Sequence, residues 1–386
     1  MINFTYHNPT KIIFGKGALS GLAREAGKLG KKALLVYGKG SLKKNGVLKT
    51  ITDSLSGAGI ETVEFGGAQP NPTVSHAEAG IKAAKENKVD FIIAAGGGSA
   101  MDTAKAIAAG AQSAAPLWDF LSGKEPVKAA LPLLTIVTMP ATASEMNGIM
   151  VLTNDLQDNM KSGIGSPFLY PRVSFLDPEL TFSVPVQATA YACSDIMSHV
   201  LESYFTNTDT FTPVQDGYAE GIVKAVIESM DRIIKNPADY DGRASFMWSA
   251  TLAWNGLGHA GVNGAAAPCH MMEYPLSGLY GLTHGAGLSV IIPAFLKFSE
   301  NTRRERILKF GTNILGLDPE ELRVSHVIET LTSYYRRIGT PANFREAGIK
   351  NPDLNLMAEQ AFANMRTRGV TGYEKADILK IYALCS

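Results

Sequence analysis

Hydrophobic residues in the first half of the chain form short runs rich in β-branched side chains, separated by stretches with helical spacing. The runs predict strands at Lys32–Tyr37, Glu61–Phe65, Asp90–Ala95 and Leu133–Thr138. Between the first three runs, apolar residues recur three and four positions apart, at Leu48, Ile51 and Leu55 and then at Ala77, Ile81 and Ala84. Alternating strands and helices indicate a parallel sheet with helices on both faces. Such a sheet normally binds its ligand at the carboxyl ends of the strands.

The pattern changes after Asp177-Pro178. From about residue 186 the periodicity is helical, and it predicts helices at Gln187–Thr206, Thr212–Lys235, Gly242–Gly258 and His284–Phe298, with more toward the end of the chain. We expect a Rossmann-like, doubly wound α/β domain over residues 1–180, followed by an all-helical domain over residues 181–386. The length of 386 residues agrees with two domains, because single cores rarely grow beyond roughly 250–300 residues.

Composition narrows the classes of partner. The 36 acidic and 36 basic side chains balance, and no basic stripe is present, so a nucleic-acid partner is not expected. Three cysteines, at positions 193, 269 and 385, cannot form a disulfide framework. The first fifteen residues lack the pattern of a signal peptide, and no segment approaches the ~18 apolar residues of a membrane span. We expect a cytoplasmic protein with no membrane partner.

A glycine cluster follows the predicted strand Asp90–Ala95. Gly96, Gly97, Gly98 and Ser99 lead into a helical stretch that begins at Ala100. Glycines let a ligand approach the main chain, and the N–H groups at the start of a helix favour negative charge. A pyrophosphate fits such a site, although a tight turn without a ligand has the same sequence, and the G-x-G-x-x-G fingerprint is absent.

A second glycine turn, Gly38-Lys39-Gly40-Ser41, follows the first predicted strand. Dinucleotide sites often carry an acidic residue here for the ribose 2′-hydroxyl, and this turn has none. Lys39, Ser41 and Lys43 suit a 2′-phosphate instead, which favours NADP. A polar surface turn with solvated lysines explains the same residues equally well.

The helical half contains a possible metal site. Asp195 and His199 are four residues apart and therefore share one face of a helix, and His270 and His284 follow later. One carboxylate and three imidazoles suit Fe²⁺ or Zn²⁺ better than Mg²⁺ or Ca²⁺. Spacing alone leaves the matter open, because a D-x-x-x-H pair is often a simple helix contact and the two later histidines can lie far away.

Taken together, the motifs resemble those of the iron-containing (group III) alcohol dehydrogenases, and the resemblance covers essentially the whole chain. It rests on the segments Gly96–Asp102, Thr138–Glu145, Asp177–Thr181, Asp195–Glu202 and Cys269–Gly287. Within the family, the sequence is most similar to the butanol dehydrogenase branch. The resemblance implies a hydride transfer between a nicotinamide cofactor and a small primary alcohol or aldehyde.

The resemblance also implies roles for individual residues. Asp195, His199, His270 and His284 would hold one divalent metal, Fe²⁺ or Zn²⁺. The cofactor would contact Gly97, Gly98, Ser99, Asp102, Thr138, Thr142, Asn147, Lys161 and Leu180, together with the turn that contains Gly38, Lys39, Ser41 and Lys43. Lys39 stands where an aspartate selects NAD in this family, so we expect NADP, with NAD possible. A homodimer is also implied, through an N-terminal strand around Asn3–Ile13.

One position departs from the family pattern. Many relatives have a further histidine four residues after the one at position 270, and this chain has Tyr274. A phenol is a poorer base than an imidazole at neutral pH. Proton transfer can therefore pass through metal-bound water, a ribose hydroxyl or Asp102, and a plain packing role for Tyr274 with low turnover is equally open. We take Asp102, Tyr274 and His270 as the candidate catalytic residues.

Four other functions stay open. A glycerol dehydrogenase or a dehydroquinate synthase shares the domain plan, but both commonly use three protein ligands for the metal. A relative that binds nucleotide but has lost most catalysis is supported by Tyr274 alone. A metallohydrolase would explain the four ligands but not the glycine cluster.

Overall fold

The structure is a computed structural model that describes residues 1–264, 267–320 and 322–386. These residues form two compact units. An α/β unit consists of His7–Val184 and Asn236–Thr251, and a helical unit consists of Met1–Tyr6, Pro185–Lys235 and Leu252–Ser386. The domain limits at residues 180 and 181 stay a prediction. Two short segments belong to the unit opposite to the one that their position in the sequence suggests. The first six residues pack with the helical unit, and residues 236–251 pack with the α/β unit.

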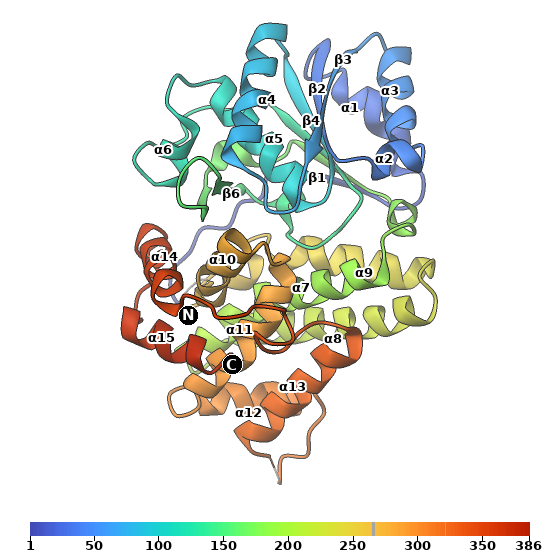
Figure 1. Cartoon of the computed structure of the whole chain (residues 1–386). Helices are drawn as coiled ribbons and strands as arrows, with labels where there is room; N and C mark the ends of the chain where they lie inside the picture. The colour runs from blue at the N-terminus through green and yellow to red at the C-terminus, as the bar shows by residue number, and fades with distance from the viewer. Residues whose placement is uncertain (265–266, 321) are drawn as a thin grey trace. The chain divides into compact units, whose positions relative to one another are not determined.

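The α/β unit is built on a six-stranded sheet with the order β1-β8-β5-β4-β2-β3, in which all neighbours are parallel (Figure 1). The strands are β1 (Lys11–Phe14), β2 (Lys32–Gly38), β3 (Glu61–Ala68), β4 (Phe91–Gly96), β5 (Leu133–Val137) and β8 (Val173–Leu176). This arrangement confirms the predicted doubly wound sheet. The strand expected around Asn3–Ile13 is shorter, because regular pairing begins at Lys11, and it lies at one edge of the sheet.

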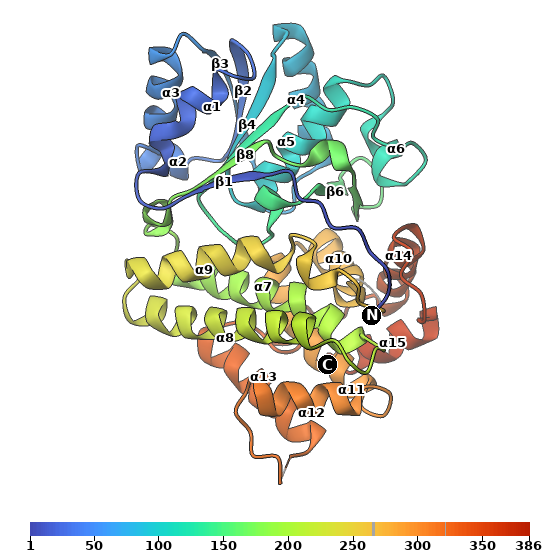
Figure 2. The ribbon, with the colours of Figure 1, turned by 180° about the vertical axis from the view of Figure 1, so that it is seen from behind.

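Successive residues of the central strands enter two separate cores. Leu35 of β2 packs in one core with Ile51, which lies on helix α3 (Val47–Gly57), while Leu34 and Val36 pack in the other with Ile107 of α5 (Gly98–Ala111). Figures 1 and 2 show the helices on both faces of the sheet. Burial on both faces explains why the strands read as continuous apolar runs.

The remaining elements of the α/β unit connect these layers. They are α1 (Leu22–Ala26), α2 (Ser41–Lys44), α4 (Val74–Asn87), α6 (Leu117–Leu121), the short 3₁₀ helices Ala18–Gly21, Ser144–Met146, Pro167–Leu169 and Pro178–Thr181, and most of α9 (Tyr240–Ala253). An antiparallel hairpin of β6 (Ile149–Asn154) and β7 (Met160–Gly165) forms a separate two-stranded sheet. The sequence pattern did not predict this hairpin.

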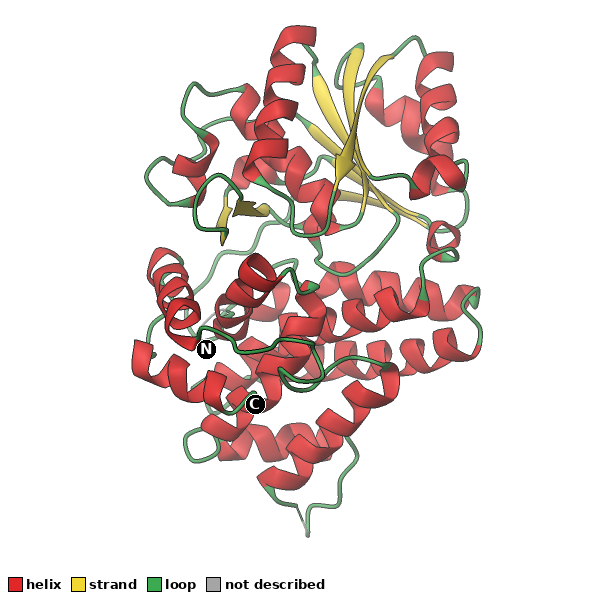
Figure 3. Ribbon diagram, in the orientation of Figure 1, coloured by secondary structure: helices red, strands yellow, loops and turns green. Residues whose placement is uncertain are grey.

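In the described residues of the helical unit, every regular element is a helix (Figure 3). These helices are α7 (Val186–Thr206), α8 (Pro213–Lys235), α10 (Pro268–Tyr280), α11 (His284–Phe298), α12 (Arg304–Asn313), α13 (Val324–Ile338), α14 (Leu354–Thr367), α15 (Lys375–Ala383) and the 3₁₀ helix Leu257–His259. Within the described ranges, no helix is both long and apolar enough to cross a membrane. The three cysteines are buried and form no disulfide.

One helix boundary differs from the prediction. The helix expected over Gly242–Gly258 begins at Tyr240 and ends at Ala253. Gly256 has a φ of 94°, in the left-handed region that breaks a helix, and the chain then forms a separate 3₁₀ turn. The apolar periodicity continues past this break, so the pattern placed the helix end too late.

Candidate metal centre and cofactor site

Three helices of the helical unit bring the four predicted metal ligands together. Asp195 and His199 lie one turn apart on α7, His270 lies in the first turn of α10, and His284 is the first residue of α11. The Nε2 atoms of His199, His270 and His284 lie 3.4, 3.7 and 3.7 Å from Asp195 Oδ1. The ligand atoms of Asp195, His199 and His270 all lie within 4.8 Å of one another. The histidines that are distant in sequence are therefore close in space.

Small residues allow the helices to approach this closely. A Cβ on Gly285 would overlap the main-chain carbonyl of Tyr191, so only glycine lets the start of α11 lie against α7. The hydroxyl of Ser194 donates a hydrogen bond of 2.5 Å to the Gly285 carbonyl and fixes the same contact. Because His284 directly precedes Gly285, this contact places its ring.

The cluster is buried, and polar atoms within it have no hydrogen-bond partner among the described residues. Asp195, His199 and His270 are 3%, 5% and 6% exposed, and His284 is partly exposed. Asp195 Oδ1 and His270 Nε2 make no hydrogen bond to any described residue. Buried polar atoms without a partner are costly, so they indicate a bound group. Two such atoms among converging nitrogen and oxygen donors fit a divalent metal ion.

The electrostatics of the ligands are strongly coupled. Burial acts to raise the pKa of Asp195, but the surrounding imidazoles, His199 foremost, lower it below its ordinary value. Burial lowers the pKa of His199 to about 3, which keeps that imidazole neutral. The ionised carboxylate and the neutral imidazole are the forms in which Asp195 and His199 ligate a metal. For His270, burial acts to lower the pKa, but the Glu202 and Asp195 carboxylates raise it to about 10, so this imidazole must release a proton when it binds a metal.

Two buried carboxylates surround the ligands, and the sequence analysis assigned them no role. Glu202 of α7 accepts a hydrogen bond from His270 Nδ1, and Glu273 of α10 accepts one from His284 Nδ1. Glu202 is 1% exposed and Glu273 is fully buried. A signal for Glu202 was present, because positions 195, 199 and 202 share one helix face. Glu273 carries no comparable signal, since its partner lies on another helix.

Aromatic rings and one further imidazole surround the cluster. The Trp254 ring lies 5.1 Å from that of His199 and 5.7 Å from that of His270. His259 packs edge-on against Trp254 at 4.2 Å. Tyr274, the departure from the family pattern, is one turn after His270, is 5% exposed, and has its ring 6.0 Å from that of His284.

The turns that carry the predicted cofactor residues after β2, β4 and β5 leave the carboxyl ends of neighbouring strands in the α/β unit. The strand order reverses between β2 and β4, because β3 lies on one side of β2 and β4 on the other. Tyr37 and Ala95 are direct partners, so the glycine turns that begin at Gly38 and Gly96 leave adjacent strand ends. Thr138 follows the next strand and donates its main-chain N–H to the Gly96 carbonyl at 2.9 Å. This topological switch point is where doubly wound sheets bind nucleotides.

The start of α5 is open to an approaching anion. Gly97 is its N-cap residue and has no side chain to occupy the first N–H groups. A Cβ on Gly98 would lie only 2.5 Å from Thr142 Cγ2, so the glycine is required for the close packing of the loop that carries Thr142. The predicted phosphate-binding residues Gly97, Gly98 and Ser99 therefore lie beside Thr142.

A buried lysine ties this loop to α5. Lys105 is fully buried, and its Nζ donates to Ser144 Oγ, to the carbonyls of Asn147 and Ile149 at 2.8 Å each, and to Asn147 Oδ1 at 3.1 Å. Asp102 accepts from Ser144 Oγ at 2.8 Å, and burial raises the pKa of its carboxyl. Asp102 and Asn147, both predicted from the sequence, thus belong to one network. The lysine that joins them was not predicted.

The predicted selectivity turn is exposed. Lys39 and Ser41 face solvent, and Lys43 Nζ lies 3.9 Å from Glu64 of the neighbouring strand and over the Tyr37 ring. The Tyr37 hydroxyl donates to the same Glu64 carboxylate. Lys39 is therefore the freer of the two cations for a phosphate.

The last two predicted cofactor residues are held by the α/β unit. Lys161 on the hairpin donates to Asn71 Oδ1 at 3.0 Å, and Leu180 packs against the core that contains Leu35.

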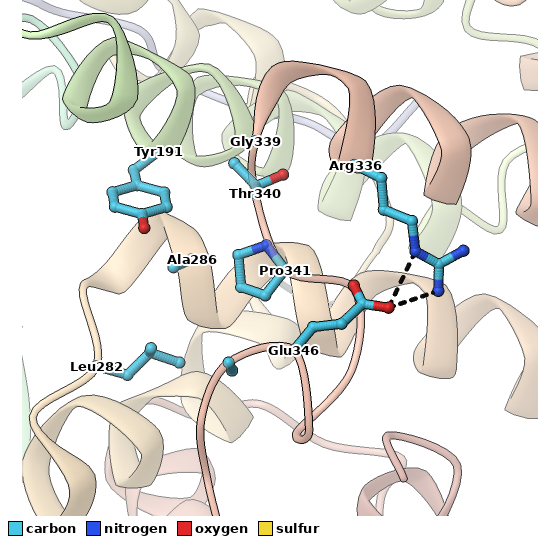
Figure 4. Close-up of a pocket in the computed structure, with 9 residues that line it drawn as sticks. Tyr191, Leu282, Ala286, Arg336, Gly339, Thr340, Pro341 and Glu346 are labelled. Carbon is cyan, nitrogen blue, oxygen red and sulfur yellow. Dashed lines mark hydrogen bonds and ion pairs between the residues drawn. The ribbon is translucent and has the colours of Figure 1, made fainter.

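A separate pocket of about 340 Å³ lies within the helical unit (Figure 4). Its walls include Tyr191, Leu282, Ala286 and Pro341. Arg336 at its side donates to Glu346 at 3.0 and 2.8 Å, so these charges neutralise each other. None of the four predicted metal ligands lines this pocket.

A doubly wound sheet with an open phosphate turn, together with a buried carboxylate and three imidazoles, is the architecture of a metal-dependent dehydrogenase. Comparisons with known proteins agree. Residues 9–178 match the iron-containing alcohol dehydrogenase family model, and residues 189–385 match the model for the C-terminal part of that family. The chain belongs to the iron-containing alcohol dehydrogenase family, on its butanol dehydrogenase-like branch.

Individual relatives cover nearly the whole chain. The NADH-dependent butanol dehydrogenase A of Clostridium acetobutylicum is 38% identical over 368 residues, or 94% of each protein. The NADPH-dependent aldehyde reductase of Escherichia coli is 35% identical over 365 residues, or 93% of each. The crystal structure of an NADH-dependent butanol dehydrogenase A from Thermotoga maritima has a TM-score of 0.95 at 36% identity, and the match covers 100% of this chain and 98% of that one.

Proposed function

We propose that the protein transfers a hydride between NADP(H) and a small primary alcohol or aldehyde, with one divalent metal bound by Asp195, His199, His270 and His284. The observation that carries this proposal is the convergence of three imidazole Nε2 atoms on Asp195 Oδ1 within 3.7 Å. Two of these buried donor atoms lack any other partner among the described residues. Three nitrogens and one oxygen suit Fe²⁺ and Zn²⁺ equally.

The chemistry divides between the bound groups and the chain. A divalent metal supplies a Lewis acid for the substrate oxygen, and the nicotinamide supplies or receives the hydride. Asp195 and the three histidines fix the position of that Lewis acid. Trp254 packs against two of the ligand rings and gives the site an apolar wall that favours an alkyl substrate. The Tyr274 hydroxyl is proposed to donate and accept the proton that accompanies hydride transfer.

The α/β unit is proposed to hold the cofactor. Gly97, Gly98 and Ser99 would contact its pyrophosphate through main-chain N–H groups at the start of α5. Both Asp102 oxygens already accept hydrogen bonds, from Ser144 Oγ and from the Val151 N–H, which favours a positioning role for this carboxylate over proton transfer. Thr138, Thr142, Asn147, Lys161 and Leu180 would line the remaining cofactor surface.

Selectivity for NADP is proposed to rest on Lys39. Its ammonium stands at the end of β2, is exposed, and has no carboxylate in its own turn. Replacement by Lys39→Asp should raise kcat/KM for NADH and lower it for NADPH, because a carboxylate repels the 2′-phosphate and accepts hydrogen bonds from a ribose. Unchanged selectivity would show that Lys39 does not determine the cofactor preference. We also propose that the enzyme works in the cytoplasm and that it forms a homodimer. Light scattering on the purified protein tests the homodimer.

The decisive experiment follows NADPH and NADH absorbance with purified, Fe²⁺- or Zn²⁺-loaded protein and butanal. We expect oxidation of NADPH that stops after chelation and returns when the metal is added back. The His270→Ala variant should lose both metal and turnover. A variant that keeps the metal and the rate would overturn the ligand assignment, and turnover by thoroughly metal-free protein would overturn the metal-dependent mechanism.

A further inference from the structure

Each of the two histidines that come from outside α7 is paired with a buried carboxylate. His270 Nδ1 lies against Glu202 Oε1, and His284 Nδ1 lies against Glu273 Oε2. His199 is different, because its Nδ1 is buried and has no hydrogen-bond partner in the described ranges. Its ring is instead fixed by packing between Trp254 and His270.

A carboxylate next to an imidazole decides which ring nitrogen carries the proton. An ionised carboxylate only accepts hydrogen bonds, so the adjacent Nδ1 must carry the hydrogen. The lone pair is then on Nε2, the atom of both rings that points at Asp195. Outer carboxylates of this kind typically change metal affinity by about 10–100-fold.

The two carboxylates differ in their second hydrogen bond. Glu202 Oε2 accepts the main-chain N–H of Cys269 at 2.5 Å, and an N–H can only donate. Glu273 Oε1 accepts the hydroxyl of Ser277 at 2.5 Å, and a hydroxyl can also accept. In these contacts Glu202 faces two N–H donors, whereas Glu273 faces one N–H donor and one hydroxyl that can also accept.

We propose that Glu202 and Glu273 are positioning residues that hold His270 and His284 in the metal-binding tautomer, and that only Glu202 requires both oxygens of a carboxylate. This inference rests on the proposed function, because it takes the histidines as metal ligands. It assigns a role to two side chains that need not touch metal, substrate or cofactor.

Replacement of each glutamate by glutamine separates the two environments. In Glu202→Gln, an amide NH₂ must face either the Cys269 N–H or His270 Nδ1. The first choice opposes two donors in a buried site, and the second forces the hydrogen of His270 onto Nε2 and blocks the ligand. In Glu273→Gln, the NH₂ can donate to Ser277 Oγ while the carbonyl oxygen still accepts from His284.

Gly287 offers a test that leaves both carboxylates in the sequence. A Cβ at this position would fall well inside contact distance of Glu273 Oε1. The glycine therefore provides the space in which Glu273 reaches His284. The Gly287→Ala variant should displace the carboxylate without removing its charge.

The experiment measures Zn²⁺ affinity by competition with a chromophoric chelator, and the visible spectrum of Co²⁺-loaded protein, for wild type, Glu202→Gln, Glu273→Gln and Gly287→Ala. Circular dichroism confirms that each variant is folded. The control is Glu346→Gln, which removes a carboxylate paired with Arg336 at the separate pocket. We expect Zn²⁺ binding to weaken about 10–100-fold in Glu202→Gln, about tenfold or more in Gly287→Ala, less than threefold in Glu273→Gln, and not in the control.

The outcomes separate this inference from the proposed function. A wild type that binds no Zn²⁺ or Co²⁺ overturns both. A wild type that binds metal, with Glu202→Gln binding equally well, overturns only the role of Glu202. Equal weakening in the two glutamine variants would show that charge rather than hydrogen-bond direction matters, and would overturn the proposed asymmetry. If Glu202→Gln does not fold, Gly287→Ala decides for Glu273, and a folded Glu202→Ala variant that binds Zn²⁺ as tightly as wild type overturns the requirement at position 202.

Discussion

Removal of the buried Lys105 ammonium should destabilise the α/β unit and loosen the loop beside the phosphate turn. In Lys105→Met, four acceptors lose a charged donor. Each such bond contributes about 1.5–3 kcal/mol. Burial lowers the pKa of this ammonium from 10.5 to about 8, so its three N–H donors form these hydrogen bonds against a desolvation cost. We expect a net loss of about 3–5 kcal/mol, as is typical when one partner of a buried charged network is removed.

The assay combines urea unfolding with hydrogen exchange of the segment over residues 142–151. Faster exchange of this segment is expected, because Lys105 is its anchor to α5, and KM for the cofactor should rise while the Zn²⁺ affinity of the helical unit stays unchanged. The matched control is Lys85→Met, which removes an exposed lysine with one hydrogen bond to the Ser113 carbonyl and should cost no more than about 0.5 kcal/mol. A Lys105→Met variant with wild-type exchange in this segment, or a loss below about 1 kcal/mol, would refute the anchoring role.

Three further predictions address other parts of the chain. Hydrogen bonds from Lys11 and Lys28 lower the pKa of Glu25 from 4.5 to about 2. The stability that Glu25 adds is therefore complete above pH 4.5 and is lost as pH falls toward 2. Comparison of Glu25→Gln with wild type by denaturant unfolding should give a difference of roughly 1 kcal/mol near neutrality, since the lysines are exposed, and none near pH 2; a difference independent of pH contradicts this. Gly98→Ala places a Cβ against Thr142 and should weaken NADPH binding at least tenfold by fluorescence titration, whereas wild-type affinity would exclude a close approach of the cofactor there. Tyr274→Phe should lower kcat about tenfold at unchanged metal content if the hydroxyl relays protons, and an unchanged kcat assigns the ring to packing.

The sequence predicts the fold where one local rule dominates. Leu34 to Tyr37 form an apolar run because both faces of β2 are buried, and that run is visible without any structure. The three consecutive glycines that begin at the last residue of β4 indicate the phosphate turn for the same reason, since the conformational requirement is local. The β6–β7 hairpin was missed because its second strand begins Met160-Lys161-Ser162-Gly163, which lacks apolar alternation. Its stability depends on packing against other elements, which the sequence does not express.

The candidate site shows the same limit at the level of single residues. The Asp195–His199 pair can be recognised from the sequence because both side chains project from the same face of one helix. His270 and His284 had to be inferred from family resemblance, and Glu273 was missed because it interacts with a histidine on a different helix. Lys105 was missed for a related reason, since a lysine in a helix normally indicates a solvated face. Only the packing of the loop over residues 142–149 reveals that this one is buried.

The residues that the sequence analysis missed are buried because each holds another part of the site in place. The proposed ligands are a metal ion and the pyrophosphate of the cofactor. A side chain that contacts such a ligand must keep one polar atom without a hydrogen bond until the ligand binds. Asp195 Oδ1 and His270 Nε2 are such atoms. A side chain with an unpaired buried polar atom rotates to form a hydrogen bond unless another contact holds the side chain in place. We propose that Glu202 and Glu273 supply that fixation for the two ligand histidines that they contact. Lys105 acts on the other unit, where it anchors the loop beside the phosphate turn. Burial of these charged side chains costs desolvation free energy. Conservative replacement of Glu202 should therefore impair metal binding more than folding, whereas replacement of Lys105 should lower both the stability of the α/β unit and its affinity for the cofactor.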